Sequence, residues 1–229
     1  QETPGSSIFP PVMTFHAFTL KVMRVLGASG LSWIHPDSEL IKPVKFKKDD
    51  GYWIDVNPIL RANAAEILAD VSEGFDDQKK LELFSVAIDA VRNGNVDIPE
   101  VVLRPDDCPS DGEVRIPDTF GDLNSLKLAD VKRVITRYYA EMKRQERIDF
   151  AGMVCEAVLA LESDTVVLDS VCEGIEHILV DEFQDTSRSQ ERLIRTLQKR
   201  RSSGKRAVRL DVVGDSDQTI FSFNGSSVK

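Results

Sequence analysis

Two short acidic segments, each directly after an apolar run, are the part of this sequence whose residue types and spacing point to chemistry. The first, ILVDEFQD (178–185), places Asp181 and Glu182 at the end of an apolar run, and the second, VVGDSDQ (212–218), repeats the arrangement with a Gly-Asp pair. A carboxylate there can hold Mg²⁺, largely through water, and a neighbouring glutamate can take a proton from an attacking water. An apolar run ending in two acids is by itself more often a solvated strand end. The extension to DEFQD and the second segment favour metal-dependent hydrolysis of a nucleotide.

The last residue of the second segment and two residues after it suit contact with phosphate and with a base. Gln218 follows the end of the apolar run, where a neutral amide can bond a γ-phosphate before hydrolysis and release it afterwards. Phe221 and Phe223 alternate around a serine, so that both rings lie on one face. Exposed rings stack on nucleic-acid bases, whereas packing in the core is the equally simple interpretation of two phenylalanines.

The order of elements around these segments predicts a parallel sheet. The segment 177–182 is typical of a buried strand, 187–200 of a helix and 207–215 of a second buried strand. A strand, a helix and a strand in this order form a βαβ unit. The carboxyl ends of such strands are the edge at which open α/β folds bind ligands.

The preceding two-thirds of the chain is expected to be mainly helical. An apolar recurrence from Thr14 to Gly27 predicts a first helix, and 44–56 predicts a hairpin turning at Asp50-Gly51. Residues 95–123, with four prolines and eight acids, are expected to be a loop or surface excursion. The remaining helices are predicted at 58–72, 76–92, 126–147, 149–161 and 164–173.

Composition limits the class of protein. The chain has 229 residues, 29 basic and 38 acidic side chains, a net charge of −9 and 41% hydrophobic residues, an ordinary globular mixture. No apolar run approaches the length of a membrane helix. The cysteines Cys108, Cys155 and Cys172 lack CxxC spacing, which argues against zinc and disulfides and favours an intracellular protein. The first residues, QETPGSS, lack a methionine and a signal peptide, which suggests that the chain was cut from a longer protein.

Four segments together resemble one family. DEFQD followed by GDSDQTIFSFNG resembles motifs II and III of the UvrD-like superfamily 1 DNA helicases, which include UvrD, Rep and PcrA. MTFHAFTLKVMR (13–24) is similar to their TFHxF motif, and RIDFAGM (147–153) is similar to the DFxxL/M segment that follows an inserted helical subdomain. The four segments occur in the order found in the family.

The resemblance implies an α/β fold with part of a RecA-like parallel sheet, in which the P-loop strand is absent, and a mainly helical inserted subdomain. It divides the chain into 1–29, a leading segment with the TFH-motif helix of the RecA-like domain, 30–148, the inserted subdomain with its hairpin and acidic loop, and 149–229, the RecA-like portion with the DEFQD and GDSDQ motifs.

The resemblance also implies roles for individual residues in an ATP-driven, 3′-to-5′ translocase or helicase acting on single-stranded or partly duplex DNA, in DNA repair. Asp181 is the metal carboxylate, and Glu182 and Gln218 are the catalytic residues, as general base and γ-phosphate contact. The nucleotide-motif residues are Asp181, Glu182, Gln184, Asp185, Gly214, Asp215 and Gln218. The expected DNA contacts are Thr14, Phe15, His16, Phe221 and Phe223. Mg²⁺ and ATP are the implied cofactors, and the expected location is the nucleus in a eukaryote or the cytoplasm and nucleoid in a bacterium.

Two departures from the family pattern limit what this chain does alone. No GxxxxGK[ST] loop is present to cradle phosphates, so we expect that Mg²⁺ and ATP need parts of a longer protein and that the isolated chain is inactive. The arginine that usually follows the second aromatic position is Asn224 here. Without the P-loop strand, the remaining strands expose edges through which the fragment could associate.

Alternatives remain open for the basic tract and for the function. The tract 188–209 holds nine basic residues and one acid, and suits either a solvated helix face or contact with a DNA backbone or a partner. A non-catalytic DNA- or protein-binding module on a helicase-like scaffold is the rival function, and the helicase–nuclease branch is a rival within the enzymes. The residues that precede Gln1 would distinguish the module from the enzyme.

Overall fold

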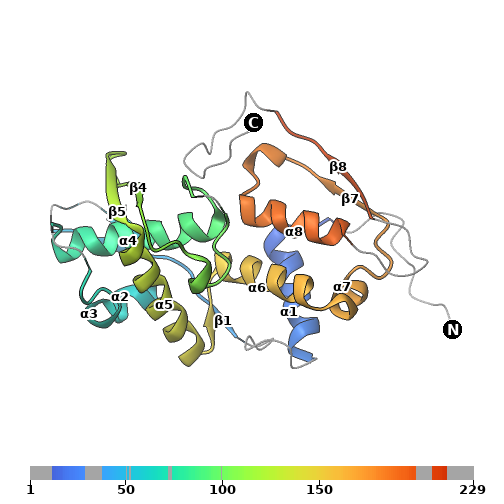
Figure 1. Ribbon diagram of the computed structural model, residues 1–229, viewed down its shortest axis with the longest axis horizontal. Helices are drawn as coiled ribbons and strands as arrows, with labels where there is room; N and C mark the ends of the chain where they lie inside the picture. The colour runs from blue at the N-terminus through green and yellow to red at the C-terminus, as the bar shows by residue number, and fades with distance from the viewer. Residues whose placement is uncertain are drawn as a thin grey trace.

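The computed structural model describes residues 12–28, 38–49, 51, 53–71, 74–98, 100–199 and 208–215. Its elements form two groups that lie side by side along the long axis (Figure 1). The first group contains β2 (Val44–Lys47), β3 (Trp53–Val56), α2 (Pro58–Ala62), α3 (Ala64–Ile67), α4 (Asp77–Asn93), β4 (Glu113–Pro117), β5 (Leu123–Lys127) and α5 (Leu128–Arg144). The second contains α1 (Phe15–Ala28), α6 (Phe150–Ser163), α7 (Thr165–Val171), β7 (His177–Val180), α8 (Arg188–Gln198) and β8 (Arg209–Val212).

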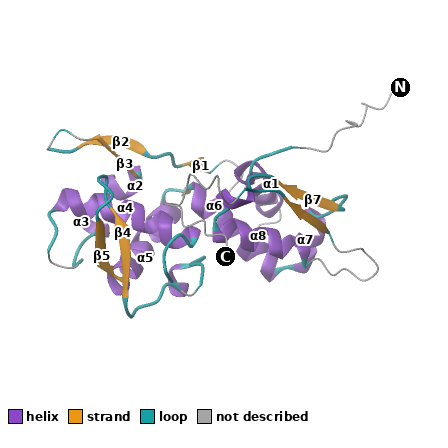
Figure 2. Cartoon of the chain, turned by 90° about the horizontal axis from the view of Figure 1, so that it is seen from above, coloured by secondary structure: helices purple, strands orange, loops and turns teal. Residues whose placement is uncertain are grey.

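A short parallel pair, β1 (Glu39–Leu40) with β6 (Arg147–Ile148), lies between the two groups, as the view from above shows (Figure 2). Single 3₁₀ turns cover Pro105–Asp107 and Phe183–Asp185. No helix within the described ranges is long and apolar enough to cross a membrane.

The predicted caps of α4 and the hairpin over 44–56 are confirmed, while Asp50 of the predicted turn lies outside the described residues. The 44–56 segment forms an antiparallel hairpin, with Val44 opposite Val56. Helix α4 begins after Asp76, whose side chain accepts a hydrogen bond from the Lys79 amide, and ends at Gly94 in the left-handed conformation. The predicted helix at 58–72 is instead two short helices, α2 and α3, because Asn63 interrupts the first and precedes the second.

The prediction of a loop over 95–123 is wrong in part, because β4 and β5 form an antiparallel hairpin. Val114, Ile116 and Leu126 point into the core while their neighbours are exposed, which is the alternation of a half-buried strand. The segment is rich in prolines and acids, which are typical of loops, and the alternation of its strands was therefore not recognised in the sequence. Pro117 stands at the end of β4, where proline is tolerated.

Each group of elements has its own hydrophobic core. The first core is formed by α2 to α5 and the hairpins, and its largest fully buried side chains include Phe84 and Tyr138. The second is formed by α1, α6, α7 and α8, with Val101 and Leu103 from the connecting segment. Ile178 of β7 packs against this second core, as do the half-buried rings of Phe15 and Phe18.

A buried ion pair joins the two cores. Arg92, in the last turn of α4, donates from Nη1 to Oδ1 and Oδ2 of Asp149 over 2.9 and 2.7 Å, and both side chains are nearly inaccessible. Tyr138 of α5 donates its hydroxyl to Asp149 Oδ2 over 2.7 Å, and Asn57 donates to the Tyr138 oxygen over 2.6 Å. Burial opposes the charge of Arg92, but Asp149 and the other groups around it together more than offset this and raise the pKa of the guanidinium above its usual value.

Asp149 also begins α6. Its Oδ1 accepts a hydrogen bond from the Gly152 amide over 2.6 Å, as an N-cap does. Gly152 has no room for a side chain, since a Cβ atom would lie 2.7 Å from Asp149 Oδ1 and 2.8 Å from Arg92 Nη2. The glycine therefore lets the helix start directly against the ion pair.

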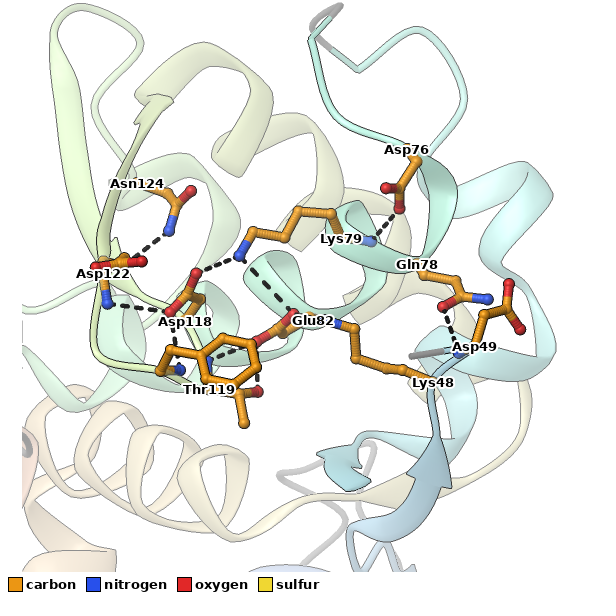
Figure 3. Close-up of polar contacts among 11 residues, drawn as sticks. Lys48, Asp49, Asp76, Gln78, Lys79, Glu82, Asp118, Thr119, Asp122 and Asn124 are labelled. Carbon is orange, nitrogen blue, oxygen red and sulfur yellow. Dashed lines mark hydrogen bonds and ion pairs between the residues drawn. The ribbon is translucent and has the colours of Figure 1, made fainter. Parts of the chain in front are cut away.

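A second polar cluster holds both hairpins against α4 (Figure 3). Glu82 of α4 accepts hydrogen bonds from the Thr119 amide over 2.6 Å and from Lys48 over 3.1 Å, next to the ends of β4 and β2. Lys79 pairs with Asp118. This contact is the main reason that the pKa of Asp118 is lowered to about 2, and hydrogen bonds from backbone amides contribute less. The turn between β4 and β5 is thus fixed from one side by α4.

The N-terminus of α8 packs against the C-terminus of α4. Arg188 donates to the Ile98 carbonyl oxygen over 3.0 Å, and Ser189 donates to the side chain of Asn93 over 3.4 Å. Gly94 has φ of 73°, and a Cβ atom there would lie 2.8 Å from Arg188 Cβ. This contact is a further link between the two groups.

The strands β7 and β8 are parallel, as predicted, with His177 opposite Arg209 and Val180 opposite Val212. The expectation that both are buried is wrong for the described residues, because Leu179 is 68% and Val212 47% exposed. The described helices cover only one face of this two-stranded sheet. An apolar run predicts a strand but does not say what covers its second face.

We predict that Asp149→Ala destabilises the chain by about 3–5 kcal/mol in urea-induced unfolding, because it leaves the Arg92 charge buried without its partner. The matched control is Glu162→Gln, which breaks the exposed pair between Glu162 and Arg192 and should cost less than about 1 kcal/mol. An Asp149→Ala variant as stable as the control variant would show that the buried pair does not hold the cores together.

Candidate active site and nucleic-acid contacts

The two acidic segments lie at the same edge of the β7–β8 sheet. The ladder continues past the strand ends, because Val213 donates its amide to the Val180 oxygen over 2.8 Å and Phe183 donates to the Val213 oxygen over 2.9 Å. Asp181 and Glu182 follow β7, while Gly214 and Asp215 follow β8 beside them, with each of these four residues exposed.

The backbone turns sharply between the two carboxylates. Glu182 adopts the left-handed conformation, with φ of 50° and ψ of 44°, which is uncommon for a residue with a side chain. Asp181 Oδ1 accepts a hydrogen bond from the Glu182 amide over 2.9 Å. Such strain is often found at functional sites, where the surrounding structure maintains it.

Gln184 connects the two segments. Its side chain is 4% exposed, its Oε1 accepts a hydrogen bond from the Asp215 amide over 3.0 Å, and its amide group donates to Glu182 Oε2. Gly214 packs directly against it, since a Cβ atom would lie 2.5 Å from Gln184 Oε1. The Glu182 carboxylate is therefore held by a buried amide that also fixes the turn after β8.

The donor set fits a hydrated Mg²⁺ ion. Asp181 and Glu182 offer exposed carboxylate oxygens at one strand end, and Mg²⁺ typically takes one or two carboxylates and keeps several waters. Asp185 Oδ1 is buried and has no hydrogen-bond partner among the described residues. No cluster of three or more metal-binding side chains occurs in the part of the chain that the structure describes, so a fully protein-coordinated site is not formed by these residues.

The TFH segment forms the first turn of α1. Thr14 is exposed, and its Oγ1 accepts a hydrogen bond from the Ala17 amide over 3.2 Å. His16 is half-buried, and burial lowers the pKa of its imidazole. Because the ring is then neutral at neutral pH, it offers one N–H donor to a partner. Phe15 is half-buried and packs against the second core, so Thr14 and His16 supply the polar side-chain groups of this segment.

Part of the predicted site lies outside the described residues, namely Gln218, Phe221 and Phe223. The structure brings the predicted residues Glu182, Gln184 and Asp215 together through hydrogen bonds. It also places the ring of His16 in contact with the ring of Phe150. Sequence reasoning did not identify Phe150 or Arg92 as important. The RIDFAGM resemblance marked the segment that contains Phe150, but Arg92 carries no signal in a single sequence.

The three arginines that the basic tract places on α8 are engaged within the chain. Arg188 contacts the Ile98 oxygen, Arg192 pairs with Glu162 over 2.7 Å, and Arg195 pairs with Glu191 over 2.5 Å. The Glu162 hydrogen bond raises the pKa of Arg192. These contacts favour the solvated-face interpretation for α8, whereas residues 200–207 of the tract lie outside the described ranges.

Comparisons with known proteins agree on one family. The family model of the UvrD/REP helicase N-terminal domain matches residues 9–229. ATP-dependent DNA helicase UvrD1 of Mycobacterium bovis is 34% identical over 105 residues, 44% of this chain and 14% of that protein. ATP-dependent DNA helicase PcrA of Leuconostoc citreum is 33% identical over 98 residues, 43% of this chain and 12% of PcrA. ATP-dependent DNA helicase Rep of Salmonella typhimurium is 38% identical over 89 residues, 39% of this chain and 12% of Rep. The matched segment thus spans a small part of each relative.

We predict that Gln184→Ala speeds hydrogen exchange of the Asp215 amide by roughly 2- to 10-fold, the usual effect of losing one hydrogen bond. Gln190→Ala removes the side-chain acceptor of a different amide, that of Ser187, and serves as the matched control, in which the Asp215 amide stays protected. Equal exchange rates in the wild type and in Gln184→Ala, measured by NMR, would contradict the proposed link between the segments.

Proposed function

The chain belongs to the UvrD/REP helicase family, and from this premise we propose that it provides the metal carboxylate and the general base of an ATP-dependent DNA helicase. The observation that carries the proposal is the Glu182–Gln184–Asp215 connection, which holds a glutamate beside Asp181 at the carboxyl edge of a parallel sheet. That edge is the usual ligand position in open α/β sheets.

In this proposal Asp181 binds a hydrated Mg²⁺ ion and Glu182 takes the proton of the attacking water. Mg²⁺, when bound with ATP, neutralises charge on the phosphates. Gln184 orients the Glu182 carboxylate through its amide group, and Gly214 permits the close approach that this requires. Asp185 and Gln218 complete the nucleotide site, Gln218 as the contact to the γ-phosphate.

We assign DNA contacts to the TFH segment, Thr14, Phe15 and His16, at the start of α1, and to Phe221 and Phe223 after β8. The proposed substrate is single-stranded or partly duplex DNA, and the proposed movement is in the 3′-to-5′ direction. The names of the similar proteins, which are ATP-dependent DNA helicases, support DNA as the class of substrate. The half-buried His16 ring and the exposed Thr14 support contact with the phosphate backbone, to which neutral N–H and O–H groups donate.

We further propose that β7 and β8 belong to a RecA-like sheet, and that residues 30–148 form the inserted subdomain between 1–29 and 149–229. The two hydrophobic cores support this division, since the first draws on residues from Ile41 to Met142 and the second on residues that flank them, together with Val101 and Leu103. The edges of the β7–β8 sheet are expected to pair with further strands of the same protein.

A non-catalytic binding module is the second candidate, and the absence of a GxxxxGK[ST] loop from these 229 residues is what favours it. In that case Asp181 and Glu182 would be solvated acids at a strand end. The two candidates differ in whether Glu182 matters to ATP turnover.

We predict that Glu182→Gln, made in the full-length protein, lowers ATP turnover by about 10²–10⁴-fold, because it removes a proton acceptor and keeps the shape of the side chain. Nucleotide binding should remain. Glu176→Gln, at the opposite end of β7, is the matched control and should leave turnover unchanged. Turnover of Glu182→Gln within a few-fold of the wild type would remove this residue from the role of general base.

We also predict that this 229-residue chain does not hydrolyse ATP by itself, because phosphoryl transfer needs groups that fix the γ-phosphate and neutralise its charge. The measurement is phosphate release with saturating Mg²⁺, ATP and single-stranded DNA. Release that Glu182→Gln eliminates would mean that the site is complete within this chain.

A further inference from the structure

The first turns of α1 and α6 meet through two rings. His16 is the second residue of α1 and Phe150 the first of α6, and their ring centroids lie 4.6 Å apart with the planes at 68°. This is an edge-to-face arrangement, which aromatic rings favour over a stacked sandwich. Because the residues are far apart in the sequence, the contact depends on how α1 and α6 pack.

Phe150 is held in place by the residue before it. Asp149 caps α6 through the Gly152 amide and is itself fixed by Arg92 and Tyr138. The Phe150 ring is 36% exposed and does not belong to either core. The fold therefore presents this ring beside His16 at the surface instead of burying it.

A neighbouring ring such as that of Phe150 can hold the His16 imidazole in one orientation. His16 lies at the start of a helix, half-buried, and the backbone of its turn is fixed by a hydrogen bond from Thr19 Oγ1 to the His16 oxygen over 3.0 Å. The imidazole itself can still rotate. An edge-to-face contact shifts such an equilibrium by roughly 2- to 10-fold in favour of one orientation.

We propose that Phe150 is a positioning residue for the DNA contact of His16, holding the imidazole so that its N–H faces the phosphate backbone. This inference rests on the proposed function of the TFH segment. It also relates the buried ion pair to the proposed DNA contact. Arg92 pairs with Asp149, Asp149 directly precedes Phe150, and the Phe150 ring contacts His16.

The experiment is a double-mutant cycle in the complete chain with His16→Ala, Phe150→Leu and both together. Affinity for a fluorescent oligothymidylate strand is measured by anisotropy, and the His16 ring proton shifts are measured by NMR. We expect Phe150→Leu to weaken binding by roughly 2- to 10-fold and to remove the ring-current shift of His16, while the double variant binds no more weakly than His16→Ala alone. Phe150→Tyr should restore both the shift and the affinity. Phe120→Leu, at an exposed ring on the β4–β5 turn, is the matched control and should change neither.

The outcomes separate this inference from the function on which it rests. If His16→Ala weakens binding and Phe150→Leu does not, or if the two losses simply add, Phe150 does not position His16 although the TFH segment still contacts DNA. If His16→Ala binds as tightly as the wild type, the DNA contact itself is wrong and the positioning role falls with it.

Discussion

One buried carboxylate, Asp149, fixes the place where the two groups of elements meet. An ionised group inside a protein requires a charge partner and hydrogen bonds for its oxygens, and Asp149 obtains these from α4, α5 and the first turn of α6. Satisfying one side chain thus fixes three helices relative to one another. The start of α6 then sets the place of Phe150, and the packing of α6 against α1 sets the place of His16.

The candidate catalytic and DNA-binding segments rest on one apolar core. Ile178 of β7 and Phe15 of the TFH segment both pack against the cluster formed by α1, α6, α7 and α8. Protein interiors are close-packed and transmit displacement of one element to its neighbours. In the proposed helicase, this shared core is a physical route by which a change at the phosphates could reach the DNA contacts.

Features set by neighbouring residues could be predicted from the sequence, whereas features set by distant partners could not. The caps of α4 and the parallel order of β7 and β8 are confirmed because cap residues and apolar runs act locally. The β4–β5 hairpin was missed because prolines and acids masked its alternation, and the exposure of Leu179 was missed because a run of apolar residues does not reveal what covers it. The amide bridge of Gln184 and the pairing of Arg92 with Asp149 depend on tertiary contacts, for which one sequence gives no signal.

We propose above all that Mg²⁺ and ATP bind at the edge formed by Asp181, Glu182 and Asp215. The most direct measurement replaces Mg²⁺ by Fe²⁺ in the full-length protein with ATP, adds ascorbate and peroxide, and maps backbone cleavage next to the metal. We predict cleavage within 180–185 and 213–215, which requires ATP and is suppressed by excess Mg²⁺. A map with ATP-dependent cleavage elsewhere and none in these two segments would contradict the claim.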